Sequence, residues 1–150
     1  MGFDLSGMNP NMSSPEPELP PFPERTDKDW EKYYDWQEEN CGTYFRNNVW
    51  WWRPLWHFVS SVCESILTEK DIESGSYNDG HRISKTKADR IARRLFKLIR
   101  NGDVKAYESV YKKHLDSLNK DNWDKSYPFS EDNVRQFANF CANSGGFTIC

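Results

Sequence analysis

Residues 46–56 hold the densest set of ligand-binding side chains in the chain. Two arginines, two asparagines and four tryptophans lie within these eleven residues. Tryptophan rings stack on nucleobases, asparagine amides hydrogen-bond to base edges, and arginine binds phosphate through paired hydrogen bonds. This mixture predicts a binding site for a nucleotide-derived ligand. The residues expected to form it are Arg46, Asn47, Asn48, Trp50, Trp51, Trp52 and Arg53.

The same stretch favours extended chain over residues 43–53, because β-branched and aromatic residues are common in strands. Side chains alternate along a strand, so one face would be core and the other would be exposed or line a cavity. The expected faces are Val49, Trp51 and Arg53 on one side, and Asn48, Trp50 and Trp52 on the other. The alternative is that the tryptophans are core residues, with the arginines stacked on them or paired to acidic residues of the N-terminal segment.

A second candidate segment, residues 76–81, is rich in turn-forming residues, and its Asp79-Gly80 pair is the strongest local turn signal. Asn78 and Asp79 could bind the hydroxyls of a ribose. Asp79 also lies close to His81 in sequence, but acid–base catalysis needs a nucleophile or bound substrate as well. The chain has no Gly-rich phosphate loop, zinc-protease helix or serine-nucleophile motif. We therefore assign no catalytic residues and expect binding rather than catalysis.

Four cysteines lie at positions 41, 63, 141 and 150, and no two of them form a Cys-x-x-Cys pair. Only three histidines are present, and the spacing matches no zinc signature. We expect free and mostly buried thiols, with no bound metal and no cofactor.

Length and composition predict one globular domain over residues 1–150. Hydrophobic residues make up 37% of the chain and aromatic residues 15%, which indicates a compact aromatic core rather than disorder. The longest apolar stretches are far shorter than a membrane span, and residues 1–5 do not resemble a signal peptide, so we expect a cytoplasmic protein. A net charge of −3 gives no overall attraction to an anionic membrane or to duplex nucleic acid, so we expect neither as a partner.

Charge is nevertheless distributed unevenly along the chain. Residues 1–40 carry ten acidic and three basic residues, whereas residues 81–113 carry eleven basic and three acidic residues. At helical spacing Arg90, Arg93, Arg94 and Lys97 share one face, which could contact phosphates or an acidic protein. The alternative is a solvated face that is partly neutralised by an acidic helix, residues 24–39, folded over it.

The pattern of elements predicts an α+β fold dominated by about five helices, with a small sheet of short strands. Thr26, Ser84 and Ser130 are expected helix N-caps. Apolar residues at helical spacing predict helices at 26–39, 54–67, 85–100, 103–118 and 131–143. Helices 85–100 and 103–118 are expected to form an antiparallel hairpin. Residues 2–5 suggest an edge strand, residues 147–150 a terminal strand, and the proline-rich residues 9–23 an arm or linker.

Several motifs together resemble those of a group of small uncharacterised proteins from phages and bacteria. The resemblance spans nearly the whole chain. It rests on Gly2-Phe3-Asp4-Leu5 with Asn9-Pro10, the run Tyr44 to Trp56, Asn78-Asp79-Gly80, Tyr127-Pro128-Phe129 and the segment Ser144 to Cys150. Some members carry a cysteine-rich insertion before the Tyr-Pro-Phe segment. This chain has only residues 121–125 there, so no metal is inferred from those relatives.

The resemblance implies a phage accessory protein acting in the cytosol of the host cell, where such proteins often block host defence. Together with the binding residues, it predicts a non-catalytic protein that binds and sequesters a small nucleotide signal as a homo-oligomer. The alternative is a protein-inhibitor module that docks an aromatic patch on a host defence protein, since exposed Trp and Arg are typical interface hot spots. A third alternative is an enzyme that modifies or cleaves a nucleotide.

Overall fold

The computed structural model describes residues 1–150, and its central element is a four-stranded antiparallel sheet. The strands are β1 (Gly2–Gly7), β2 (Tyr44–Asn48), β3 (His81–Ile83) and β4 (Phe147–Ile149), in the order β2-β1-β4-β3. This sheet and six helices confirm the predicted α+β class. The expectation that the first strand lies at an edge is wrong, because β1 pairs with both β2 and β4.

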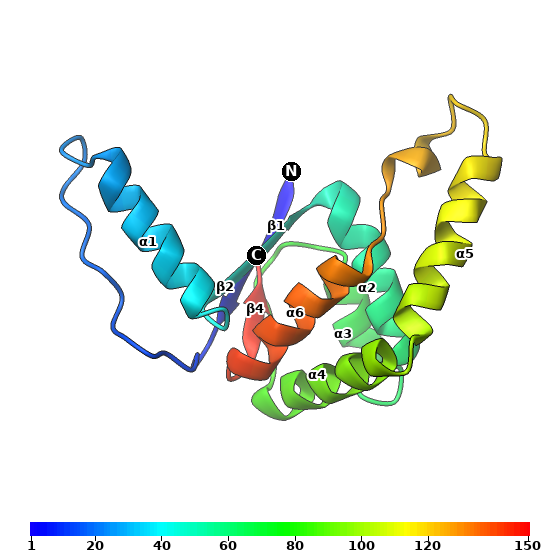
Figure 1. Cartoon of the computed structure of the whole chain (residues 1–150). Coiled ribbons are helices and arrows are strands. Elements are labelled where there is room, and N and C mark those ends of the chain that lie inside the picture. Colours follow the sequence, from blue (N-terminus) through cyan, green and yellow to red (C-terminus); the bar gives the residue numbers. More distant parts are fainter.

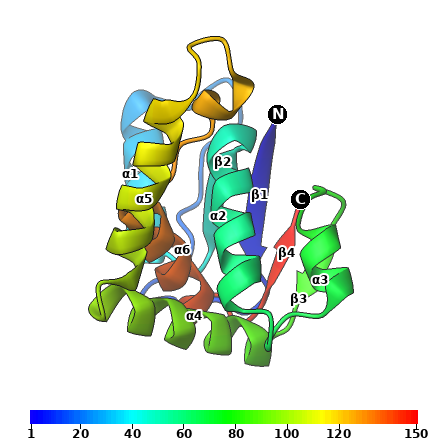
Figure 2. The ribbon, with the colours of Figure 1, turned by 90° about the vertical axis from the view of Figure 1, so that its right-hand side faces the viewer.

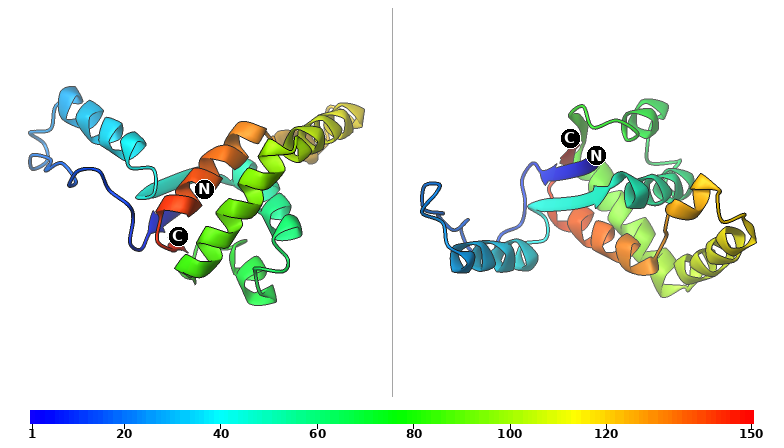
Figure 3. Two further views of the ribbon diagram at one scale, coloured as in Figure 1. Left: turned by 60° about the horizontal axis from the view of Figure 1, so that its bottom comes forward. Right: turned by 90° about the horizontal axis from the view of Figure 1, so that it is seen from above.

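Helices cover one face of the sheet and leave the other open (Figures 2 and 3). The helices are α1 (Asp27–Glu39), α2 (Val49–Val62), α3 (Glu69–Ser74), α4 (Lys85–Arg100), α5 (Asp103–Ser117) and α6 (Glu131–Asn143), with the short 3-10 helix η1 (Trp123–Ser126). The side chains of β1 alternate in burial as this arrangement requires. Phe3 and Leu5 are buried beneath the helices, and Ser6, which pairs with β2 and β4, is exposed. None of the helices combines the length and the apolar character that crossing a membrane requires.

The three predicted N-caps are confirmed. The side chains of Thr26, Ser84 and Ser130 each accept a hydrogen bond from the backbone N–H three residues ahead. The short helix α3 was not predicted, although Thr68 and Asp71 form a capping box at its start. Six residues are too few to show a helical pattern of apolar positions, so the capping box was its main sequence signal.

The expected boundary and geometry of residues 49–53 are wrong. The strand ends at Asn48, whose side chain accepts a hydrogen bond from the N–H of Trp51 and caps α2. Pro54 consequently lies inside the helix rather than at its first position. The capping asparagine outweighs the strand preference of the Val-Trp-Trp-Trp run, so the three tryptophans point in different directions around a helix instead of alternating.

Two segments project from the body of the protein on opposite sides (Figure 1). On one side, residues 9–23 run back along α1: Trp36 Nε1 donates to the backbone oxygen of Ser14 (3.0 Å), and Tyr33 donates to Glu16 (3.0 Å). This proline-rich segment is therefore an arm packed on α1. The acidic helix points away from the body, so it does not fold over the basic helix as one alternative expected.

On the other side, α5 turns steeply away from α4 instead of packing beside it as a hairpin (Figures 1 and 2). Gly102 supplies the left-handed turn between them, with φ at +80°. Helix α4 lies along α6, and of the residues of α5 only Val104 is buried. The outer part of α5 thus stands over α2, where the ring of Tyr107 packs against Phe58 with centroids 4.8 Å apart.

Candidate functional site

The first three residues of the predicted site have structural partners. Arg46 lies on the open face of the sheet, where its Nε is 3.5 Å from Asp4 Oδ1. Asn47 faces the helices and exchanges two amide hydrogen bonds with Asn133 of α6 (3.1 and 2.9 Å). Asn48 caps α2. These contacts occupy the whole amide of Asn47, whereas in the exposed Asn48 they occupy only the amide oxygen.

The tryptophans of the predicted site divide between the core and the surface. Trp52 has no exposed surface, stacks on Phe3 and donates its indole N–H to the backbone oxygen of Gly75 (2.8 Å). The expectation that Trp52 stacks on a ligand is therefore wrong. Trp51 is partly buried, and Trp50 remains at the surface end of α2.

Asn78 and Asp79 lie in the loop between α3 and β3. Asn78 Nδ2 donates to the backbone oxygen of Gly2 (3.2 Å), and Gly2 is the register partner of Asn48. Asp79 is exposed. The predicted residues thus fall into separate groups: one around the start of β1, one in the core, and one at the surface of α2 that consists of Trp50 and Arg53.

Arg53 lines a cleft that sequence patterns did not predict. This α2–α5 cleft has a volume of about 420 Å³ and lies where α5 and η1 pass over the outer face of α2. Arg53 and His57 are four residues apart and so share one face of α2. The lining residues are Arg53, Pro54, His57, Tyr107, Tyr111, His114, Leu115, Asp124 and Tyr127.

Three tyrosines give the cleft its aromatic wall. Tyr107 and Tyr111 are stacked, with ring centroids 6.2 Å apart, and both pack on the buried Phe129. The hydroxyl of Tyr111 donates a hydrogen bond to the backbone oxygen of Tyr127 (2.6 Å), which joins the residue directly after η1 to α5. Burial raises the pKa of Tyr107 and of Tyr111, so both hydroxyls are neutral at pH 7.

Trp50 extends the aromatic surface beyond the cleft. Its ring centroid lies 4.9 Å from that of Tyr127 and 6.2 Å from that of Trp123, and the two indoles are nearly parallel at 24°. Trp123 is 74% exposed. A flat surface of this kind at the mouth of a cleft can stack against a planar ring.

Arg53 supplies the cationic group. Its guanidinium forms no ion pair, and its only side-chain partner is the hydroxyl of Tyr127 at 3.4 Å. The two imidazoles of His57 and His114 add nitrogen donors or acceptors, and Asp124 contributes one carboxylate. The cleft can therefore bind a flat group that carries an anion and hydroxyls.

A second cavity, with a volume of about 490 Å³, lies between α2 and α3. It shares Arg53 and His57 with the α2–α5 cleft, so these two side chains separate the two cavities. Ser60 also lines this cavity, and its buried hydroxyl has no hydrogen-bond partner. Arg53 and His57 thus stand on the ridge between two cavities.

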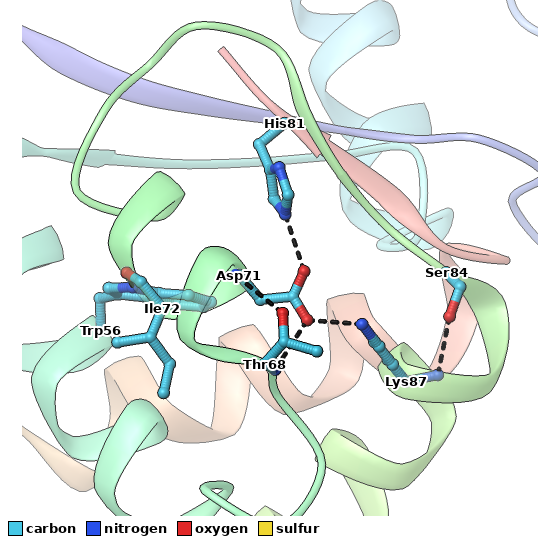
Figure 4. A network of polar contacts seen from close by, with 7 residues as sticks. All are labelled: Trp56, Thr68, Asp71, Ile72, His81, Ser84 and Lys87. Carbon is cyan, nitrogen blue, oxygen red and sulfur yellow. Dashed lines mark hydrogen bonds and ion pairs between the residues drawn. The ribbon is translucent and has the colours of Figure 1, made fainter.

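His81 does not pair with Asp79 but with the buried Asp71 (Figure 4). One carboxylate oxygen of Asp71 lies 2.8 Å from His81 Nε2, and the other accepts from Lys87 Nζ (2.5 Å) and from the N–H of Thr68 (3.0 Å). Burial alone would raise the pKa of Asp71, but these hydrogen bonds outweigh it and hold the pKa well below its usual range. This cluster joins α3, β3 and α4, so we interpret it as a structural clamp.

The thiols do not supply a nucleophile in the core. All four cysteines are free, as expected, and two of them, Cys63 and Cys141, are buried. Burial raises the pKa of Cys63 to about 11 and that of Cys141 well above its usual value, so both thiols stay protonated at pH 7. No three His, Cys, Asp or Glu side chains converge in a way that could hold a metal ion.

No protein-family model matches the sequence, and neither a curated protein nor a solved structure is significantly similar to it. The candidate site therefore rests on its own geometry. Of the predicted residues, only Arg53 lines the cleft, and Trp50 contacts the lining residue Tyr127. The tyrosines of α5, which helical spacing placed on an apolar stripe, are the main residues that were missed.

Proposed function

We propose that the protein binds a small nucleotide-derived ligand in the α2–α5 cleft and sequesters it without chemical conversion. One observation carries the proposal: an arginine without an ion pair lies beside an aromatic wall in a cleft. Arginine binds phosphate through two parallel hydrogen bonds, and aromatic rings stack on bases. The volume of about 420 Å³ falls in the range of small-molecule sites.

The lining suggests how such a ligand would lie. A base would stack on the exposed ring of Trp123, next to the partly buried Trp50 and Tyr127. The phosphate would then meet Arg53 within the cleft, while the Asp124 carboxylate would accept hydrogen bonds from ribose hydroxyls. The proposed role is sequestration because no activated nucleophile faces the cleft. Removal of a nucleotide signal would fit the phage accessory role that the sequence motifs suggest.

Calorimetric titration with a panel of adenine and guanine mononucleotides and dinucleotides tests this proposal. We expect at least one member to bind the wild-type protein at a stoichiometry of one per cleft, and to be recovered unchanged after prolonged incubation. Arg53→Gln should weaken that binding at least 10-fold, because a bidentate phosphate contact is lost. Arg82, which is exposed on β3 outside the cleft, provides the matched control, and Arg82→Gln should leave the affinity unchanged.

A folded protein that binds no member of the panel would overturn the proposal. Equal affinities of the wild-type protein and Arg53→Gln would place the ligand elsewhere. Conversion of the ligand that Arg53→Gln abolishes would instead indicate an enzyme.

The exposure of Trp123 favours a second candidate function. An indole that is 74% exposed and stacked on another indole is typical of a hot spot for protein binding. In that case the patch would dock on a host protein. Trp123→Ala would then abolish the recovery of a stoichiometric partner from host lysate, while the Arg53→Gln variant would still recover it.

A further inference from the structure

We infer that the acidic outer face of α1 docks on the basic face of α4 in a second copy of the chain. The inference is independent of the ligand site. It rests on two complementary charged surfaces that the fold exposes and holds apart within one molecule.

The basic surface has no acidic partner within the chain. Arg90, Arg93 and Lys97 are exposed on α4 and form no ion pair. With Arg94 and Ile66 they line a shallow hollow of about 230 Å³. Arg94 is fixed there, because its guanidinium donates to the backbone oxygen of Val62 (2.7 Å). Asp89, the one acidic residue of α4, pairs instead with Lys85, and Asp71 of α3 pairs with Lys87, both near the start of α4.

The acidic surface is equally unpaired. Helix α1 has six acidic and two basic residues. Tyr33 and Trp36 bind the proline-rich arm, whereas Glu31, Asp35 and Glu38 are exposed. Glu31 and Asp35 also line an open hollow between α1 and residues 14–17 of the arm. None of these three carboxylates forms an ion pair within the chain.

The spacing of the two sets of charges is compatible. Glu31, Asp35 and Glu38 follow i, i+4, i+7 spacing, and Arg90, Arg94 and Lys97 follow the same spacing, with Arg93 beside them. At 1.5 Å per residue, each row spans about 10 Å along its helix. Two helices lying side by side could therefore bring all three carboxylates opposite basic groups.

The structure prevents the two faces from meeting within one chain. The base of the α1 projection is anchored to α6: Gly42 packs tightly against the backbone of Asn143, and the N–H of Asn11 in the arm donates to the backbone oxygen of Asn143 (2.8 Å). From this anchor α1 extends away from α4 (Figures 1 and 3). The contact must then form between molecules.

A second copy fits the basic face better than a nucleic acid does. The chain carries a net charge of −3, and the acidic α1 would repel a phosphate backbone. A second copy presents both faces, so a two-fold dimer would form the α1–α4 contact twice. Because the contact consists of exposed charges, it should weaken as salt screens them.

Charge reversal tests this inference directly by sedimentation equilibrium. The wild-type protein should dimerise at 50 mM NaCl, and its dissociation constant should rise at least 10-fold at 500 mM NaCl. The double variants Arg90→Glu/Arg93→Glu and Glu31→Lys/Asp35→Lys should each be monomeric when alone. An equimolar mixture of the two should form a heterodimer, because both of its contacts would again join opposite charges.

The matched control is Lys105→Glu/Lys113→Glu, which reverses two exposed lysines of α5 and should still dimerise. Circular dichroism must show that every variant is folded. A wild-type protein that is monomeric at 50 mM NaCl would overturn the inference, as would a dimer that both charge-reversal variants retain. Retention of nucleic acid that is lost in Arg90→Glu/Arg93→Glu, without dimerisation, would assign the basic face to nucleic acid instead.

Discussion

Asp71→Asn is expected to lower the free energy of unfolding by about 3 kcal/mol at pH 7. The side chain of Asp71 is only 6% exposed, and its carboxylate is the shared partner of His81 and Lys87. Asparagine cannot neutralise the lysine, which would be left half-buried without its counter-charge. Urea denaturation measures the loss, and the melting temperature should fall by roughly 6–12 °C.

The lowered pKa of Asp71 also predicts how the stability loss of Asp71→Asn depends on pH. Because the folded-state pKa of Asp71 lies below its ordinary value of 3.8, the carboxylate stabilises the fold fully at pH values above that range. This contribution is lost as the pH falls towards the folded-state pKa. The difference in unfolding free energy between wild type and Asp71→Asn should therefore shrink as the pH falls below about 4. A difference that stays constant down to pH 2.5 would contradict the ionised clamp.

Trp52→Ala should destabilise the fold by about 4 kcal/mol, since it removes a fully buried indole. The variant loses the stacking of Trp52 on Phe3 and on Trp56, whose centroids lie 5.4 and 5.3 Å away, and it orphans the backbone oxygen of Gly75. Denaturant titration is again the measurement.

Trp50→Ala is the matched control, because it removes the same side chain two residues earlier. We expect it to cost about 1 kcal/mol or less, since Trp50 is only partly buried. It should nevertheless weaken ligand binding, whereas Trp52→Ala should affect binding only through stability. Equal stability losses for the two variants would contradict the division between core and surface tryptophans.

Helix N-caps were the features of the fold that could be predicted best from the sequence. Thr26, Ser84 and Ser130 were predictable as N-caps because a cap acts within three residues of itself. Asn48 carried the same local signal, but the strand preference of the following residues concealed it. Once α2 starts at Val49, its helical geometry directs Trp52 into the core and Arg53 to the surface.

The tyrosines that line the cleft opposite α2 could not be predicted from local sequence patterns. Tyr107 and Tyr111 have helical spacing with Val104, which indicated a core stripe. Only Val104 is fully buried, because Gly102 turns α5 away from α4 and lays its outer part over α2. The contact between Tyr127 and Trp50 joins residues 77 positions apart, so it depends on how the helices pack and not on sequence spacing.

Indole resonances in a ¹⁵N–¹H NMR spectrum, followed during titration with the tightest-binding nucleotide of the panel, test the central proposal most directly. Trp50 and Trp123 flank the cleft, whereas Trp52 and Trp56 hold their indole N–H groups in hydrogen bonds to the backbone of α3 and the residue after it. The proposal predicts saturable shifts of the Trp50 and Trp123 signals, with those of Trp52 and Trp56 nearly unchanged. Saturable binding that leaves Trp50 and Trp123 unmoved would contradict it.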